Sequence, residues 1–186
     1  MALSACNAVS NPSFETGILA PWHPSAVNVA QVSNGTIAYS GDYYLYESPS
    51  LSSQTTISDT NEVMCTSNLQ TAVGNRGNTI SQGLRHLKPH TEYKFSAQAQ
   101  VPSPSGSEYC SVYVYVGRNA TVGSIASVQL FNFGEWTEVT GSYVPKRENE
   151  ILSIGAACDS EDSSYTDNVL FDDISFIPND CAYGLA

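Results

Sequence analysis

Tyrosine and glutamine side chains at alternate positions of two segments have the clearest binding chemistry in this sequence. Tyr113 and Tyr115 are two positions apart, and so are Gln98 and Gln100. In a β-strand each pair lies on one face, with its members about 6.5–7 Å apart. Sugar rings stack on tyrosine, and amides hydrogen-bond hydroxyl groups. If the two strands are neighbours, the four side chains form one carbohydrate-binding surface; the alternative is a solvated sheet face whose tyrosines only stabilise strand pairing.

Carboxylates near the two ends of the chain are the second candidate for chemistry. Glu15 lies near the N-terminus, and the adjacent Asp172 and Asp173 lie near the C-terminus. Adjacent aspartates repel each other unless a cation is near, and a hard cation with oxygen ligands is the natural partner. The alternative is a pair of solvated carboxylates on opposite faces of a strand.

Motifs of the common enzyme classes are absent from the sequence. It contains no G-x-S-x-G, H-E-x-x-H, P-loop or dinucleotide-binding fingerprint, and the spacing of His23, His86 and His90 is not typical of a metal site or a triad. The acidic pair Glu161 and Asp162 lies in a Ser-rich segment typical of a loop, without a predicted cleft for a glycosidase. We therefore expect a protein that is not an enzyme.

The segments that must position these residues have a period of two. The residues Val112, Val114 and Val116 alternate with Tyr113 and Tyr115, which places the valines on a core and the tyrosines outside it. Other segments with strand character are residues 27–33, 43–47, 78–84, 93–101, 124–131, 136–144, 151–158 and 169–177. Many short strands separated by turns indicate an all-β, antiparallel β-sandwich. We expect a single domain over residues 1–186, with residues 48–75 as a long loop.

Composition and charge narrow the partners and the compartment. The formal net charge is −11, which disfavours nucleic acid and anionic membrane surfaces as partners. Five cysteines without zinc spacing, together with the glycosylation sequons at Asn34 and Asn119, favour a secreted protein in an oxidising compartment. The first five residues lack the character of a signal peptide, so we interpret the signal peptide as already removed. Apolar runs are shorter than the ~18 residues that cross a bilayer.

Five separated motifs, taken in order, resemble one family. They are NPSFETG (11–17) with Trp22, YSGDYYL (39–45), ISQGL (80–84) with LKPHTEYKFS (87–96), WTEVTG (136–141) and FDDISF (171–176). The chain resembles the galactose-binding-like β-sandwich carbohydrate-binding modules of families 4, 9 and 22, and the related modules of secreted fungal proteins. The resemblance covers nearly the whole chain and implies a jelly-roll sandwich without catalysis of its own. In the family the region of residues 48–75 often supplies a sugar-stacking aromatic, and here it contains no Trp, Tyr or Phe.

The same resemblance implies a structural calcium ion. Carried over by position, its ligands are the carbonyl oxygens of Ser13 and Tyr43 and the side chains of Glu15, Ser40 and Asp172. Ser40 stands where some members have a carboxylate. The ion ties three chain segments together and performs no chemistry.

Two disulfides are expected. Cys110 begins one alternating segment and Cys158 ends another, so antiparallel pairing brings them together. Cys6 and Cys181 lie just outside the motifs that the resemblance places side by side at the calcium ion, which leaves Cys65 unpaired. The rival is a bridge from Cys65 to Cys6 or Cys181.

These features favour a monomeric module that binds a polysaccharide or glycan, attached to a larger secreted protein. The alternative is a structural or adhesive extracellular domain that contacts protein and binds no sugar. We expect Trp22 and Trp136 to pack in the core or at an edge. A second location for sugar is the loop end, where the tyrosines are Tyr39, Tyr44, Tyr46 and Tyr165.

Overall fold

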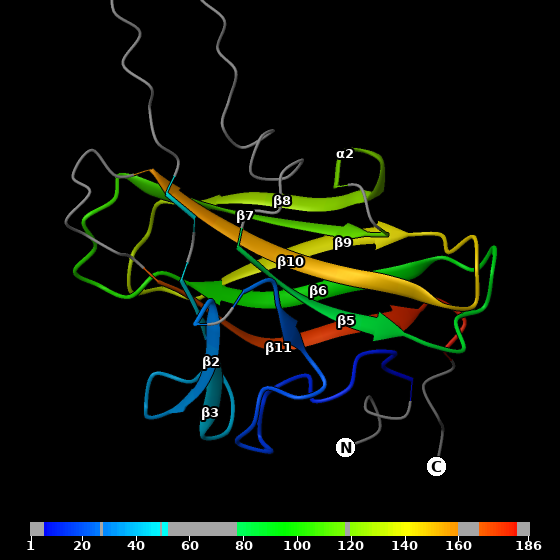
Figure 1. Ribbon diagram of the computed structural model, residues 1–186, viewed down its shortest axis with the longest axis horizontal. Helices are drawn as coiled ribbons and strands as arrows, with labels where there is room; N and C mark the ends of the chain where they lie inside the picture. The colour runs from blue at the N-terminus through cyan, green and yellow to red at the C-terminus, as the bar shows by residue number, and fades with distance from the viewer. Residues whose placement is uncertain are drawn as a thin grey trace, which may run out of the picture.

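Two β-sheets make up the computed structural model, which describes residues 6–26, 28–48, 50–51, 78–117, 120–159 and 168–181. The first sheet, called sheet A, has the strand order β1-β5-β10-β7-β8, and the short β4 pairs with β10 outside this path. Its strands are β1 (His23–Pro24), β4 (Ser50–Leu51), β5 (Thr79–Leu84), β7 (Tyr109–Val116), β8 (Ser124–Leu130) and β10 (Glu150–Asp159). The helical turn α2 (Ala120–Gly123) precedes β8 (Figure 1).

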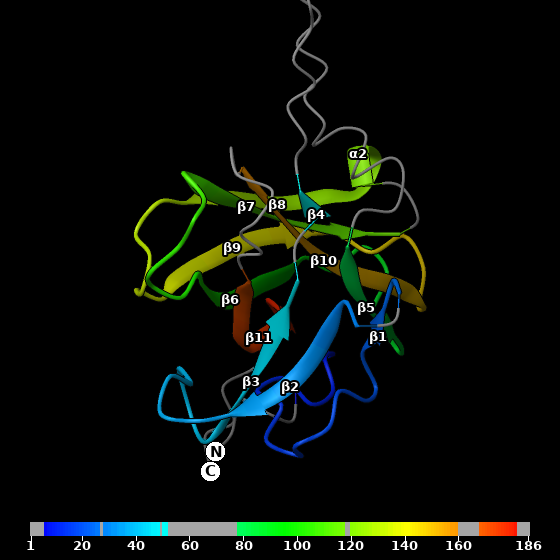
Figure 2. The ribbon, with the colours of Figure 1, turned by 60° about the vertical axis from the view of Figure 1, so that its left-hand side comes forward.

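The second sheet, called sheet B, has the order β2-β3-β11-β6-β9. Its strands are β2 (Ala30–Asn34), β3 (Tyr43–Glu47), β6 (Tyr93–Gln100), β9 (Thr137–Tyr143) and β11 (Val169–Pro178). Neighbouring strands pair antiparallel throughout both sheets, except for the parallel contact between β4 and β10. Figure 2 shows the two layers from the side where β2 and β3 come forward. The predicted all-β jelly-roll sandwich is confirmed.

The core fills the space between the sheets with alternate residues of each strand. On β7 these are the predicted valines, and on β10 they are Leu152, Ile154 and Ala156. Phenylalanines from β6 and β11 and Trp22 from the N-terminal segment pack into the same cluster. Trp22 is 2% exposed, as expected of a core residue.

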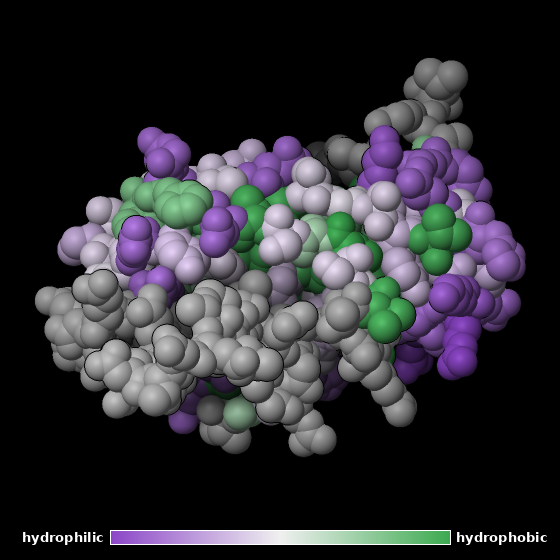
Figure 3. Space-filling model, turned by 90° about the horizontal axis from the view of Figure 1, so that it is seen from above, coloured by the Kyte–Doolittle hydropathy of each residue, from purple (hydrophilic) through white to green (hydrophobic). Residues whose placement is uncertain are grey.

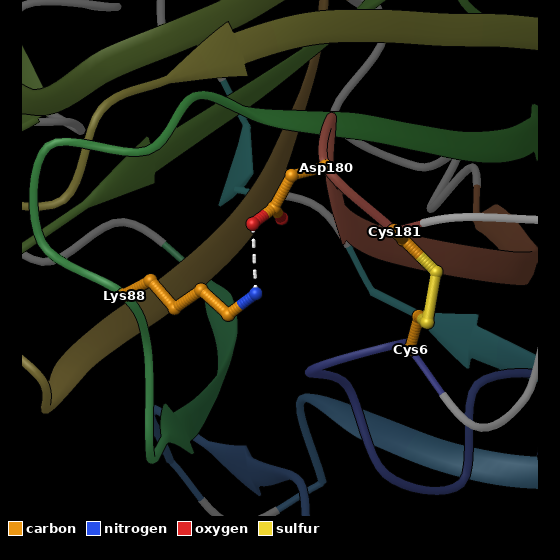
Figure 4. Close-up of a disulfide and its surroundings, with 4 residues drawn as sticks. All are labelled: Cys6, Lys88, Asp180 and Cys181. Carbon is orange, nitrogen blue, oxygen red and sulfur yellow. Dashed lines mark hydrogen bonds and ion pairs between the residues drawn. A yellow bond between two sulfur atoms is a disulfide. The ribbon is translucent and has the colours of Figure 1, made fainter.

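Disulfides tie the fold at two places, and both agree with the predicted pairing. Cys110 and Cys158 are direct cross-strand partners on β7 and β10 and form one bridge. Cys6 and Cys181 form the other, so the two ends of the described chain lie side by side (Figure 4). Beside this bridge, Lys88 Nζ lies 2.8 Å from Asp180 Oδ2 and links the end of β11 to the β5–β6 turn. Cys65 lies outside the described residues.

Strand positions follow the sequence pattern closely. The segment 43–47 is β3 as predicted, and the boundaries of the other predicted strands differ by at most three residues. Most of the predicted loop 48–75 lies outside the described residues, although Ser50–Leu51 forms β4. Within the described part of the chain, no helix is long and apolar enough to span a bilayer.

Candidate functional site

The outer face of sheet A carries the predicted tyrosines. Because Val112, Val114 and Val116 point into the core, the alternating Tyr113 and Tyr115 point away from it. On the neighbouring β10 the same outer face is formed by small residues, namely Ser153, Gly155 and Ala157. The direction of the tyrosines away from the valine core is therefore as the sequence predicts.

The predicted surface that joins these tyrosines to Gln98 and Gln100 is wrong. The glutamines lie on β6, which belongs to sheet B, whereas the tyrosines lie on β7 in sheet A. Consecutive strands of a sandwich often belong to different sheets, and here the chain crosses between sheets after β6. Gln100 is also buried, and its amide nitrogen donates a hydrogen bond to the Gly134 carbonyl at 2.7 Å.

Tyr113 is covered as well, with 5% of its surface exposed. Its ring lies on Gly155, the residue opposite it on β10, where a Cβ atom would stand 2.5 Å from the ring. Only glycine admits this approach. Burial, and then the charge of Glu47, raise the pKa of the Tyr113 hydroxyl far above its ordinary value. Tyr113 is therefore not an exposed platform, and Tyr115, which is half-buried, is the accessible member of the pair.

Two aromatic rings that the sequence did not suggest lie at one end of this face, one exposed and one half-buried. Tyr109 begins β7 on the same side as Tyr113, and its ring centroid lies 5.7 Å from that of Phe131, which is 59% exposed. Asp159 is the cross-strand partner of Tyr109 on β10; burial first, and then this carboxylate, raise the pKa of Tyr109. Extending the alternation of β7 back by two residues from Ser111 would have identified Tyr109.

The segments predicted to bind calcium do come together. Glu15 accepts backbone N–H groups of Asp42 and Tyr43, at 3.0–3.3 Å. Gly41, with a φ of +63°, is required beside it, because a Cβ there would lie 2.4 Å from the Glu15 carboxyl carbon. The N-terminal loop is thereby fastened to the start of β3.

The aspartate pair completes this junction from β11. The strand has a register shift between Asp172 and Ser175, and Asp173 has a positive φ of 47°, so both aspartates reach the same residue. The carboxylate of Asp172 accepts the Ser40 N–H at 2.9 Å, and that of Asp173 accepts the hydroxyl groups of Ser40 and Ser13. The calcium ligands implied by the family resemblance include Asp172 and not Asp173, which a regular strand would point to the opposite face.

Asp172 is fully buried and also accepts the N–H of Asp173 at 2.7 Å. Burial raises its pKa to about 6, and the backbone N–H groups lower it only in part. Among the described residues no three Asp, Glu, His or Cys side chains are placed to hold a metal ion, so a cation here depends on carbonyl and hydroxyl oxygens as well. Two carboxylates with such neutral oxygens suit calcium and do not suit zinc.

The described tyrosines of the predicted loop-end site lie at sheet B. Tyr39 is 49% exposed, and its ring meets that of Trp136 edge-on at 5.8 Å, while the indole N–H donates to the Ile37 carbonyl. Trp136 therefore packs at an edge, as expected. Tyr44 and Tyr46 alternate with the buried Leu45 on β3 and point out of sheet B. Tyr165 and the sequon residue Asn119 lie outside the described residues, and Asn34 is exposed at the end of β2.

Comparison with protein families gives a match over residues 52–155, more than half of the 186-residue chain. The matching family model is CBM_4_9, described as a carbohydrate binding domain. Comparison with curated proteins gives no match.

Several solved structures share the fold. TmCBM61 in complex with β-1,4-galactotriose is 15% identical, with 92% of this chain and 98% of that chain covered and a TM-score of 0.58. The CBM22-1 xylan-binding domain from Paenibacillus barcinonensis Xyn10C is 15% identical, with 92% and 94% covered and a TM-score of 0.53. A family 16 carbohydrate-binding module is 19% identical, with 92% and 99% covered and a TM-score of 0.52. At these identities the likeness establishes the fold.

Proposed function

Because the chain belongs to the CBM_4_9 family of carbohydrate binding domains, we propose that it is a non-catalytic module that binds a polysaccharide. The family match carries this proposal. The absence of enzyme motifs from the sequence supports the non-catalytic part.

The aromatic end of sheet A is the proposed main contact with the sugar. The rings of Tyr109 and Phe131 lie together, and Phe131 is largely exposed. Together, the exposed ring of Phe131 and the half-buried ring of Tyr109 offer apolar faces on which pyranose C–H groups stack. Gln129, exposed on the adjacent β8, supplies an amide for sugar hydroxyl groups. Tyr115 is the second proposed contact, about 20 Å further along β7.

Retention in affinity electrophoresis tests this proposal. The first panel contains xylan and β-1,4-galactan, because the structural relatives bind xylan and β-1,4-galactotriose. We expect Phe131→Ala to weaken binding by about 1–3 kcal/mol, the loss typical of a truncated aromatic anchor. Tyr39→Ala is the matched control, because Tyr39 is a similarly exposed ring at the loop end.

The outcomes separate the alternatives. If Tyr39→Ala abolishes retention and Phe131→Ala does not, the site lies at the loop end. If a broad panel of glucans, xylans, galactans and chitin is not retained at all, the adhesive domain that contacts protein becomes the better hypothesis.

We also propose that calcium binds at the junction of Glu15, Ser40 and Asp172. The support is the meeting of three chain segments on oxygen-bearing side chains and the full burial of the Asp172 carboxylate. Ser13 and Tyr43 would add carbonyl oxygens. The ion would stabilise the fold.

Two disulfides support an extracellular location, since such bridges persist in oxidising compartments. Attachment to a larger secreted protein is part of the same proposal.

A further inference from the structure

A pocket lies at the end of sheet A opposite to the aromatic pair. Gly83, Gly117 and Ile151 line it. Gly83 is the cross-strand partner of Ile151, and the Gly117 N–H donates to the Ile151 carbonyl at 2.8 Å. No atom lies within 4 Å of the position of a Cβ at Gly83 or Gly117, so the two glycines leave the floor of the pocket open.

Two turns hold the basic side chains of the pocket. Arg85 and His86 follow β5, and Arg147 precedes β10. Backbone hydrogen bonds join these turns, from Leu87 N–H to the Glu148 carbonyl and from His90 N–H to the Pro145 carbonyl, each 3.0 Å long. Hydrophilic residues gather at the right-hand end of Figure 3, the end at which the β9–β10 turn lies in Figure 1.

The charge of this pocket is opposite to that of the chain. The sequence contains seven Lys and Arg residues and eighteen Asp and Glu residues. Two of the seven basic residues, Arg85 and Arg147, nevertheless line this pocket. The described residues form one ion pair, between Lys88 and Asp180. Neither arginine therefore has a carboxylate of the described residues within 4.0 Å. Glu150 also lines the pocket, so two arginines outnumber one carboxylate there; burial first, and then Glu150, raise the pKa of the nearby Tyr143 hydroxyl.

We propose that this pocket binds an anionic substituent of the glycan, a uronic acid carboxylate or a sulfate ester. The inference rests on the proposed carbohydrate-binding function and adds a preference for acidic sugars. An arginine guanidinium presents a fork of N–H donors that matches such oxyanions. Tyr115 lies two residues before Gly117, just inside the end of β7 at Val116, so their Cα atoms are at most about 7 Å apart, within the span of one sugar unit.

A pair of polymers that differ only in charge tests this proposal. The probes are glucuronoxylan and the same glucuronoxylan after reduction of its carboxyl groups to alcohols. We expect the acidic form to bind more tightly at low salt, and the preference to shrink as salt is raised. A sulfated galactan and its desulfated form are the second pair. A preference in the first pair identifies a carboxylate, and a preference in the second pair alone identifies a sulfate.

Charge-neutral variants locate the effect. We expect Arg85→Gln and Arg147→Gln each to reduce the preference for the acidic polymer about two- to five-fold, and the double variant about ten-fold, as for partly exposed charge pairs. Binding of the reduced polymer should not change. Lys94→Gln is the control, because it removes one exposed positive charge from sheet B. Both arginines are exposed, so melting curves should confirm that the variants fold.

Equal binding of acidic and reduced polymers, unchanged by the arginine variants, would overturn this inference and leave the proposed function intact. If neither polymer nor any neutral member of the panel binds, the proposed function fails and this inference fails with it. A loss of preference in Lys94→Gln equal to that in the arginine variants would show a general charge effect and would also overturn the inference.

Discussion

Asp172 and Glu47 are the two carboxylates that the described residues bury completely, and their surroundings differ. Asp172 accepts backbone N–H groups of Ser40 and Asp173. Neither oxygen of Glu47 has a hydrogen bond of normal geometry in the described part of the chain. The nearby Ala156 N–H lowers the pKa of Glu47 and so offsets part of the effect of burial. Burial raises the pKa of Asp172 to about 6 and the pKa of Glu47 well above its ordinary value.

Burial alone does not decide the charge of a carboxylate, because nearby backbone N–H groups can offset it. Asp172 lies at an irregularity in β11, where backbone N–H groups converge on it. Such groups stabilise an ionised carboxylate and prepare it for a cation. Glu47 lies at the end of β3, where the chain leaves sheet B for β4 in sheet A. With so little compensation, burial shifts Glu47 toward its neutral, protonated form.

The largest expected effect is the loss of Asp172. Asp172→Ala leaves two buried N–H groups without their acceptor, and we expect the free energy of unfolding to fall by about 3–4 kcal/mol. Denaturant unfolding measures this loss. Asp180→Ala is the matched control, because Asp180 belongs to an exposed ion pair and its removal should cost less than about 1 kcal/mol. Equal losses in the two variants would contradict the special role of Asp172.

Calcium should increase the difference in stability between the wild-type chain and Asp172→Ala. At a calcium concentration about 100 times its Kd, the free energy of unfolding of the wild-type chain should rise by about 2.7 kcal/mol, and chelator should remove the gain. Asp172→Ala should not respond to calcium. A melting curve of the wild-type chain that is the same in calcium and in chelator would end the calcium proposal.

Glu47 should make the free energy of unfolding depend on pH. Its pKa is raised in the folded state, so the folded chain keeps a proton that the unfolded chain releases near its ordinary pKa of about 4.3. The stability contribution is therefore fully present below about pH 4.3 and is lost as pH rises through the folded-state pKa. Glu47→Gln keeps the shape and cannot titrate, so its stability relative to wild type should increase from pH 4 to pH 7. Parallel pH profiles of the two proteins would show that Glu47 is not held neutral.

Sequence periodicity predicted the strands and the direction of the side chains well, because a strand alternates its residues whatever its neighbours are. The valines of β7 lie in the core, and Tyr113 and Tyr115 point away from it, as predicted. The pairing of Cys110 with Cys158 follows from the same alternation and antiparallel order.

Contacts between strands were harder to predict, because they depend on which strands are neighbours and on their register. Gln98 and Gln100 are two positions apart, as residues on one face of a strand are, but β6 lies in the sheet opposite to β7. The covering of Tyr113 depends on Gly155, which is 42 positions later in the sequence and faces it only once β10 is in register. The contact of Asp173 with Ser40 depends on the irregularity in β11, which the motif FDDISF does not reveal.

The smallest expected effect concerns the hydroxyl group near Glu47. The Tyr113 hydroxyl is buried and has no hydrogen-bond partner among the described residues, so its desolvation is not compensated. Tyr113→Phe should leave the free energy of unfolding unchanged or raise it by up to about 1 kcal/mol, because it removes an unsatisfied polar group and keeps the ring on Gly155. Tyr93→Phe is the matched control: Tyr93 is equally buried, but its hydroxyl accepts the Lys88 N–H at 2.9 Å, so this variant should lose about 1 kcal/mol. Chemical denaturation of both variants measures the difference, and a loss of stability in Tyr113→Phe as large as that in Tyr93→Phe would mean that the Tyr113 hydroxyl has a partner, with Glu47 the nearest candidate.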